Sequence, residues 1–435
     1  MSENKPEASQ KSNQRKFIVL DIVFYGSSLN YDQGTANYQE LKKITKWDGK
    51  IHTLVSRYAL RYSILETGNK LKFWDLAEGS KLKRAGKGDK TVIQPSTKVL
   101  LSGEILKYPE FDLFGYLVTD TTPQNWREAP VKISHAISMT PYNYDAQFAG
   151  NLGLAKRMIE AGVAEKMDPN LFTVEEHQTY YIYTIVIDVD RVGKMEVYLA
   201  KDGENDLEDL KVEKKTNKTE KKSDLEDLED EKETNETEKK SDDRNKEKSK
   251  CKLNDISIKE NKIILTLKDG GAPLEIQIPS GITAHLDKKD KIFAVKFEED
   301  KDSSQKKIKN LIKTVLKLKR SIKGREEFLE PKLLVIGCYK GSYRSFKDQI
   351  ILSNEYEEIY EEDVKEEENG RTRIVRRIAK LNKPTFIIKG LLEREINVIE
   401  EKVIIDEFVE NFLQNQNQEN KVKIFKSPEI EVKFE

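Results

Sequence analysis

A duplicated, highly charged segment interrupts this chain and limits what can belong to its core. Residues 206–223 (DLEDLKVEKKTNKTEKKS) and 224–241 (DLEDLEDEKETNETEKKS) match at 14 of 18 positions. Residues 201–250 contain 14 basic and 19 acidic side chains and almost no core-forming ones. Such a segment buries too little apolar surface to offset the conformational entropy lost on folding. We therefore predict a disordered insertion at 201–250, with a charged single helix as the alternative.

The charged segments hide the charge of the remaining chain. The whole sequence has 76 basic and 77 acidic residues, a net charge of −1. A second acidic segment, 354–369, holds nine acids and one lysine. Outside the two segments, 61 basic residues face 49 acidic ones, a net charge of about +12. A basic folded part is expected of a protein that binds phosphate groups.

Several classes of protein are disfavoured. The polar residues 1–16 predict a disordered tail and lack the apolar stretch of a signal peptide. The longest apolar runs are only strand-sized, so we expect a cytoplasmic protein without a membrane partner. Two distant cysteines, Cys251 and Cys338, and four scattered histidines favour neither a disulfide scaffold nor a metal site. We also expect no cofactor and, because no hydrolase motif is present, no catalytic residues.

Strand-like and helical patterns alternate along the chain. Strands are predicted at 17–26, 97–106, 114–120, 130–140, 179–192, 291–299 and 332–339, with a hairpin at 255–279. Helices are predicted at 55–66, 303–320 and 404–413. This order predicts an α+β fold built on a β-α-β-β-α-β sheet with long insertions. We expect one elaborated domain over 17–435.

The loop at 26–32 and the helix at 55–66 form the most informative pair of features. The small residues Gly26, Ser27 and Ser28 allow a polymer backbone to approach, and Asn30 offers hydrogen bonds. Ser56 is an expected N-cap, and Arg57 and Arg61 share one helix face. Helix N-terminal amides beside two guanidinium groups can hold phosphate. The alternative is an ordinary turn beside two solvated arginines.

Two further features admit alternatives. Asp32 could serve a metal-assisted ribonuclease, although loop aspartates are more often turn residues. Four arginines follow the acidic segment directly, and they either pair with it or bind phosphate. They are Arg371, Arg373, Arg376 and Arg377.

Four blocks of sequence, in order, resemble a known family. They are residues 30–64 (NYDQGTANYQELKKITKWDGKIHTLVSRYALRYSI), 112–117 (DLFGYL), 131–148 (VKISHAISMTPYNYDAQF) and 179–192 (TYYIYTIVIDVDRV). The chain resembles the CRISPR-associated Cascade backbone subunits, the Cas-seven family, in its type I-B DevR-like branch. The resemblance implies a palm built on an RRM-like (ferredoxin-like) sheet, with a finger insertion and a thumb at about 138–178.

The resemblance also implies a function. Copies would form a helical filament along a CRISPR RNA and support target DNA recognition in antiviral defence. The implied partners are CRISPR RNA, the target DNA strand, further copies of the chain, and the large, capping and guide-processing endoribonuclease subunits. The implied RNA-binding residues are Gly26, Ser27, Ser28, Asn30, Lys46, Ser56, Arg57, Arg61, His135, Ser138 and Phe148. The implied wedge against the duplex comprises Phe114, Gly115, Tyr116 and Leu117.

Two other functions remain open. Type III relatives cut target RNA with a loop aspartate, which makes Asp32 the candidate for a metal-dependent endoribonuclease. A DNA-binding transcriptional regulator would need a reading helix, and no helix-turn-helix pattern is evident.

Overall fold

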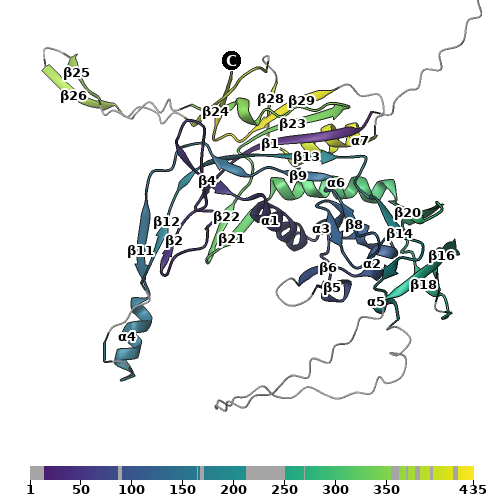
Figure 1. The fold of residues 1–435 in the computed structure, drawn as a ribbon. Coiled ribbons are helices and arrows are strands. Elements are labelled where there is room, and N and C mark those ends of the chain that lie inside the picture. The colour runs from purple at the N-terminus through teal and green to yellow at the C-terminus, as the bar shows by residue number, and fades with distance from the viewer. Residues whose placement is uncertain are drawn as a thin grey trace, which may run out of the picture. The chain divides into compact units, whose positions relative to one another are not determined.

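The computed structural model describes most of the chain (Figure 1). The described residues are 14–86, 91–163, 165–166, 171–211, 250–268, 270–353, 362–368, 371–377, 383–391, 395–414 and 420–435. Most of the expected N-terminal tail, most of the duplicated insertion and the start of the acidic segment lie outside these residues.

The chain forms two compact units that alternate along the sequence. Unit 1 comprises Met1–Leu76, Pro130–Val192 and Ser304–Glu435. Unit 2 comprises Ala77–Ala129 and Gly193–Ser303. The described residues form many strands and few helices, which confirms the predicted α+β class.

A largely antiparallel sheet is the centre of unit 1. Its middle strand β1 (Lys16–Ser27) is almost fully buried and pairs with β13 (Gln178–Asp188) on one side and β23 (Leu333–Lys340) on the other. The sheet continues beyond β13 through β10 (Ala136–Ser138), β4 (Ile51–Val55) and β3 (Lys43–Thr45). Beyond β23 come β29 (Lys421–Lys426) and β28 (Ile396–Val398), and β9 (Val131–Ile133) also pairs with β13.

Two helices and a smaller sheet complete the core of unit 1. Helix α1 (Arg57–Lys70) follows β4, and α6 (Lys301–Leu316) precedes β23; both lie on the same side of the central sheet (Figure 1). Strands β24 (Ile350–Leu352), β27 (Thr385–Ile388) and β30 (Glu431–Phe434) form the smaller sheet. Its Phe386 packs with Val23, Ile182 and Val335 of the central strands. A π-helix (Val403–Val409) and α7 (Glu410–Gln414) occupy the predicted helix near 404–413.

An arm extends from unit 1 between β10 and β13. Strands β11 (Ala146–Gly150) and β12 (Leu171–Glu175) pair antiparallel, and β12 pairs in parallel with β2 (Tyr38–Gln39). Helix α4 (Leu152–Glu160) lies at the far end of the arm (Figure 1). The arm coincides with the expected thumb region, about 138–178.

The helix predicted at 303–320 ends earlier than expected. α6 stops at Leu316, and the chain turns into β21 (Lys319–Ile322), which pairs with β22 (Arg325–Phe328). The reason is that Leu318 is buried and the backbone N–H of Lys319 donates to Thr67 Oγ1 at 3.4 Å. The amphipathic pattern continues through 320, but a tertiary contact of α1 ends the helix.

Unit 2 has its own apolar core, formed by small sheets and short helices. Its residues include Val99, Val197, Ile256 and Phe297. The sheets are β14 (Lys194–Ala200), β20 (Ile292–Glu299) and β19 (Ile282–Lys288); β15 (Glu204–Asn205), β16 (Cys251–Lys259), β17 (Lys262–Leu267) and β18 (Leu274–Gln277); β5 (Leu82–Ala85) with β6 (Val92–Pro95); and β7 (Tyr116–Val118) with β8 (Asn125–Arg127). The helices are α2 (Thr97–Leu101), α3 (Pro109–Asp112), α5 (Glu208–Lys211) and a 3₁₀ turn at Glu104–Lys107.

The strand predicted at 97–106 is wrong, because this segment is helical. Ser96 caps α2 by accepting a hydrogen bond from the Val99 amide, and Gly103 adopts φ +78° and ends the turn. The apolar run therefore reflects a short buried helix rather than a buried strand, an ambiguity that periodicity alone does not resolve.

The edges of both acidic segments contain ordered strands. β15 and α5 lie within the predicted insertion, and Leu207 between them is buried, so ordered chain continues to Lys211. In the second segment, β25 (Glu362–Glu368) pairs with β26 (Arg371–Arg377). Their register sets Glu362 opposite Arg377 and Glu366 opposite Arg373.

None of the helices in the described ranges is long and apolar enough to cross a membrane.

Candidate nucleic-acid interface

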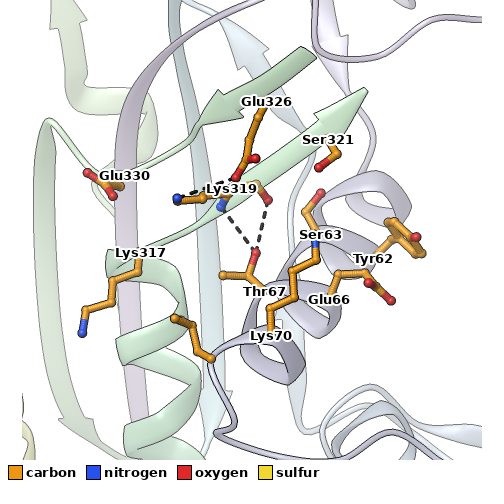
Figure 2. Close-up of a pocket in the computed structure, with 11 residues that line it drawn as sticks. Tyr62, Ser63, Glu66, Thr67, Lys70, Lys317, Lys319, Ser321, Glu326 and Glu330 are labelled. Atoms are coloured by element: carbon orange, nitrogen blue, oxygen red, sulfur yellow. Dashed lines mark hydrogen bonds and ion pairs between the residues drawn. The ribbon is translucent and has the colours of Figure 1, made fainter. Parts of the chain in front are cut away.

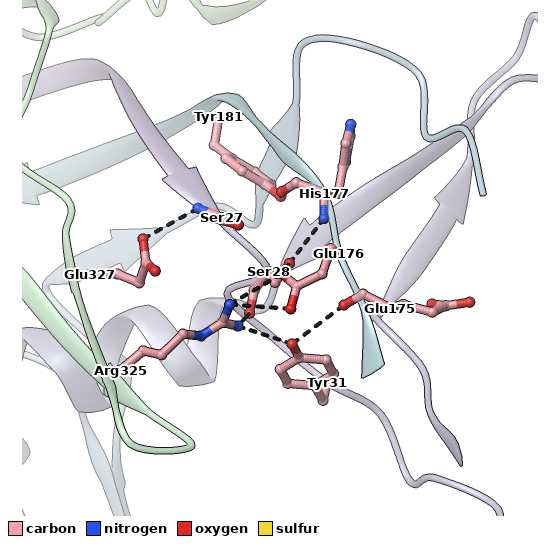
Figure 3. Close-up of polar contacts among 9 residues, drawn as sticks. All are labelled: Ser27, Ser28, Tyr31, Glu175, Glu176, His177, Tyr181, Arg325 and Glu327. Carbon is pink, nitrogen blue, oxygen red and sulfur yellow. Dashed lines mark hydrogen bonds and ion pairs between the residues drawn. The ribbon is translucent and has the colours of Figure 1, made fainter. Parts of the chain in front are cut away.

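The loop after β1 is held by contacts within unit 1. Ser28 is fully buried with φ +52°; its amide donates to the His177 carbonyl at 3.1 Å, and its hydroxyl donates to the Glu176 carboxylate (Figure 3). The same hydroxyl accepts from the His177 amide at 2.9 Å. At Gly26, an added Cβ would stand 2.9 Å from Leu29 Cδ1. Gly26 and Ser28 therefore fix the shape of the loop, and the Ser28 hydroxyl bonds inside the protein.

The β21–β22 hairpin holds the same loop with basic side chains. Arg325 donates to the Tyr31 hydroxyl at 3.0 Å and pairs with Glu176 at 3.1 Å (Figure 3). Arg320 Nε donates to the Leu29 carbonyl at 2.7 Å. Lys323 Nζ lies 4.2 Å from the centre of the Tyr31 ring.

Sequence reasoning missed this hairpin because it assigned residues up to 320 to a helix. Two arginines and a lysine within six residues (Arg320 to Arg325) are the signal that could have identified it. On the loop side, Ser27 contributes its amide, which donates to Glu327 at 3.3 Å.

Asn30 joins this loop to the start of α1. Its side-chain Oδ1 accepts from the Ser56 amide at 2.8 Å. Ser56 is the N-cap, as predicted, because its hydroxyl accepts from the Ala59 amide at 3.2 Å. Both side chains thus position the first turn of α1.

The first two turns of α1 carry arginine and tyrosine in alternation. Arg57 is exposed, and Tyr58 and Tyr62 are 64% and 61% exposed. The Arg57 guanidinium donates to the Tyr58 hydroxyl at 2.8 Å, which lowers the Tyr58 pKa. Arg61 is half-buried one turn later. Basic groups bind phosphates and aromatic rings stack on bases, so this surface suits a single-stranded nucleic acid. The R-Y-x-x-R-Y spacing could have revealed both tyrosines.

His135 adds a donor beside Arg57. The Arg57 amide donates to His135 Nδ1 at 3.0 Å. Because Nδ1 accepts this bond, the neutral ring carries its hydrogen on Nε2. Burial, followed by the charges of Arg57 and Lys347, lowers the His135 pKa. The ring is therefore a neutral donor of one hydrogen bond at physiological pH.

Lys347 and Lys46 continue the row of cations. Lys347 Nζ donates to the Ser134 hydroxyl at 3.3 Å and to the His135 carbonyl at 3.4 Å. Burial is the main reason that the pKa of Lys347 is lowered, and the nearby charge of Lys46 lowers it further. Burial likewise lowers the Lys46 pKa. Arg57, Lys347 and Lys46, with neutral His135 in contact with the first two, form what we call the cationic row. Lys347 was missed because it lies in a loop without a periodic pattern.

Ser138 and Phe148 have different surroundings. Ser138 is fully buried; its hydroxyl accepts from the Thr53 amide at 3.1 Å and donates to the Thr140 carbonyl at 2.8 Å. Phe148 lies on the arm and is 67% exposed. Ser138 therefore stabilises the start of the arm, whereas the Phe148 ring is available for contacts.

The four wedge candidates belong to unit 2. Gly115 adopts φ +78°, and an added Cβ would stand 2.4 Å from the Arg127 carbonyl oxygen, so only glycine fits. Tyr116 packs on the unit 2 core, where burial raises its pKa. Phe114 is half-buried, and Leu117 is half-exposed opposite Trp126. Leu117 is thus the most accessible of the four.

A cavity of about 530 Å³ lies between α1 and the β21–β22 hairpin (Figure 2). Thr67 joins its two walls through hydrogen bonds with the Lys319 backbone, and Lys319 pairs with Glu326 at 3.6 Å. Glu66, Glu330, Lys70 and Lys317 also line the cavity. This mixture of signs does not favour a polyanion, so we assign the candidate interface to the N-terminal half of α1.

Asp32 lies on the surface of the loop. Its carboxylate accepts from Lys42 Nζ at 3.1 Å and from the Gln33 amide, and both bonds lower the Asp32 pKa. Within the described ranges, no group of three or more His, Cys, Asp or Glu side chains is arranged to hold a metal ion.

Comparison with known proteins identifies the family. The model of the family "CRISPR-associated negative auto-regulator DevR/Csa2" matches residues 18–360. The chain therefore belongs to the CRISPR-associated DevR/Csa2 family. No curated protein matches the chain.

Solved structures with similar chains come from CRISPR complexes. A chain of a "CRISPR RNA-guided surveillance complex" is 10% identical, with a TM-score of 0.33, covering 77% of this chain and 73% of that one. A chain of the pre-nicking state of such a complex is 10% identical, with a TM-score of 0.34 and coverages of 74% and 78%. A chain of a "Type IV-B CRISPR Complex" is 14% identical, with a TM-score of 0.23 and coverages of 39% and 72%.

Proposed function

We propose that this protein is an RNA-binding backbone subunit of a type I-B CRISPR surveillance complex. Copies of it form a filament along a CRISPR RNA and support recognition of a target DNA strand in antiviral defence. The observation that carries the proposal is the convergence, in unit 1, of the loop after β1, the arginine–tyrosine surface of α1 and the cationic row. Membership of a CRISPR-associated family supports the same conclusion.

The order of strands supports an RRM-like palm. In sequence, unit 1 runs β1, α1, β10, β13, α6 and β23, while in space the strands lie in the order β23-β1-β13-β10. This is the order of a β-α-β-β-α-β sheet, with each helix connecting two strands of the sheet. The arm serves as the thumb. Unit 2, whose two segments interrupt unit 1 in sequence, belongs to the same elaborated fold and includes the finger.

The proposed mode of binding is recognition of the backbone. The cations of the cationic row bind phosphates, and the Nε2–H of its neutral member, His135, donates a hydrogen bond to one phosphate oxygen. Tyr58 and Tyr62 stack on bases without selecting them. Sequence is read by pairing between guide and target, so the protein needs no contacts that identify bases. In this role the chain acts without catalysis of its own.

The arm supplies a surface for assembly. Leu152, Leu154 and Met158 of α4 are 57%, 50% and 46% exposed, and Phe148 is exposed nearby in β11. Exposed apolar residues clustered in this way commonly mark a protein interface. They contact the next copy along the RNA. The large, capping and guide-processing subunits complete the proposed complex.

The first test is RNA binding by the purified full-length chain. We expect the chain to bind single-stranded RNA of CRISPR-repeat sequence, to form oligomers on it, and to lose affinity steeply as salt rises. Fluorescence anisotropy at several salt concentrations measures the affinity, and mass photometry measures the oligomers. Binding of duplex DNA in preference to RNA would instead favour an auto-regulator, as the family description suggests. Mg²⁺-dependent cleavage of RNA that Asp32→Asn abolishes would favour a nuclease.

His135 is expected to bind RNA as a neutral ring, so the affinity should change less than about twofold between pH 8 and pH 7. Protonation would place a second hydrogen on Nδ1 and break the bond from the Arg57 amide, and burial already holds the His135 pKa below its ordinary value of 6.5. His135→Gln, whose side chain can accept from the amide and donate to phosphate, should keep most of the affinity, whereas His135→Ala should lose about threefold to tenfold. Fluorescence anisotropy at each pH measures both effects. Equal affinities of wild type and His135→Ala would remove His135 from the interface.

A further inference from the structure

Trp47 is an unusual surface residue, because 97% of its side chain is exposed. For comparison, only 8% of Trp74 is exposed. An indole ring is large, rigid and apolar with one polar N–H, and tryptophan is enriched where proteins contact their partners. We propose that Trp47 is a stacking platform for a base of the bound single-stranded RNA. This inference rests on the proposed function and adds a binding site to it.

The turn that carries Trp47 is well ordered by its own hydrogen bonds. It connects β3 to β4, and the Lys46 amide donates to the Lys50 carbonyl at 2.9 Å. The Gly49 amide donates to the Lys46 carbonyl at 3.0 Å, and Gly49 adopts φ +78°. Asp48 accepts from the Lys50 amide at 3.1 Å. A rigid turn presents the ring at little entropic cost on binding.

Lys46 joins the turn to the cationic row. It directly precedes Trp47, its charge acts on Lys347, and within the described ranges it forms no salt bridge. Asp48 and Asp348 are the acidic groups near Lys46. On the other side of the turn, Lys50 pairs with Asp48 at 3.9 Å and lines an open cavity of about 760 Å³ whose other residues include Asp145 and Glu176, so this side carries both signs of charge. A phosphate chain bound along the row therefore reaches the indole from the side of Lys46.

Stacking on a base fits both the ring and its surroundings. Every base offers a flat face, so a tryptophan binds RNA of any sequence, as a guide-carrying scaffold requires. The turn does not need an aromatic residue to form, because its hydrogen bonds are made by backbone groups and by Asp48. The site comprises Lys46, Trp47 and Lys50.

The test compares RNA with and without bases. Trp47→Ala, Trp47→Phe and the control Tyr198→Ala, an exposed aromatic residue of unit 2, are each titrated with labelled oligouridylate and with an abasic chain of equal length. We expect Trp47→Ala to weaken oligouridylate binding about tenfold while the affinity for the abasic chain is unchanged. Trp47→Phe retains most of the affinity, and the control matches wild type. In a Trp126→Phe background, oligouridylate should quench the fluorescence of Trp47.

Each other outcome has a defined meaning. If wild type binds neither chain, the proposed function fails, and with it this inference. If wild type binds RNA but Trp47→Ala binds equally well, only the stacking platform is overturned. Equal losses for both chains would show that Trp47 supports the fold or the charge of the site rather than a base. If Trp47→Ala keeps its RNA affinity but no longer forms oligomers on RNA, the ring contacts a protein and the inference is also overturned.

Discussion

Replacing Arg57 and Arg61 together with alanine is expected to weaken RNA binding about 100-fold at low salt, roughly tenfold for each cation removed. The slope of log affinity against log salt should also fall by about 1.4, because each lost phosphate contact with a single strand contributes about 0.7. Anisotropy titrations between low and moderate salt measure both quantities. The fold should persist, because Ser56 caps the helix through its own hydroxyl and the bond to His135 Nδ1 is donated by the backbone amide of residue 57, which alanine retains.

The matched control removes two lysines from unit 2. Lys194 and Lys262 form exposed ion pairs with Glu298 and Glu275. Lys194→Ala/Lys262→Ala changes the net charge of the chain by the same amount as the arginine pair. If both double variants lose affinity equally, the effect reflects overall charge, and the α1 surface is not the binding site.

Asp21→Ala is expected to destabilise unit 1 by about 2–3 kcal/mol, since it leaves buried donors without an acceptor. The Asp21 carboxylate accepts from the Thr184 hydroxyl at 2.6 Å, the Ser345 hydroxyl at 2.7 Å and the Phe346 amide at 2.6 Å. Burial outweighs these hydrogen bonds and raises the Asp21 pKa, because removing the carboxylate from water destabilises its charged form. Thermal denaturation measures the loss of stability, and hydrogen exchange at Phe346 reports the freed amide.

The same substitution should weaken RNA binding indirectly. Ser345 and Phe346 directly precede Lys347, so Asp21 positions the loop that carries this member of the cationic row. The control is Asp406→Ala, an exposed aspartate of unit 1, which should change the stability by less than about 0.5 kcal/mol. Full protection of the Phe346 amide in Asp21→Ala would contradict the assigned role.

Local patterns predicted the strands and the helix start that position the interface. The β1 run is apolar from Phe17 to Tyr25 except at Asp21 because the strand is covered on both faces, and Ser56 is the N-cap that its residue type suggests. Tertiary contacts determine the features that these local patterns did not predict. The contact of Thr67 with the Lys319 backbone ends α6 before its pattern ends, and no local rule places Lys347 beside His135. Ser28 and Ser138 are small and polar in sequence, but only the fold shows that their hydroxyls are bound internally.

The β15–β16 pair has a consequence for how this chain can vary in length. Glu204 pairs with Lys252 and Asn205 with Cys251, so unit 2 holds the chain at adjacent strand positions on either side of residues 206–250, which include the charged duplication. For a connection anchored in this way, each doubling of its length costs only about 0.6 kcal/mol of closure entropy. A repeat gained or lost there leaves the register of both strands intact. The duplication could thus arise by copying a stretch of gene at a position where selection for stability hardly opposes it.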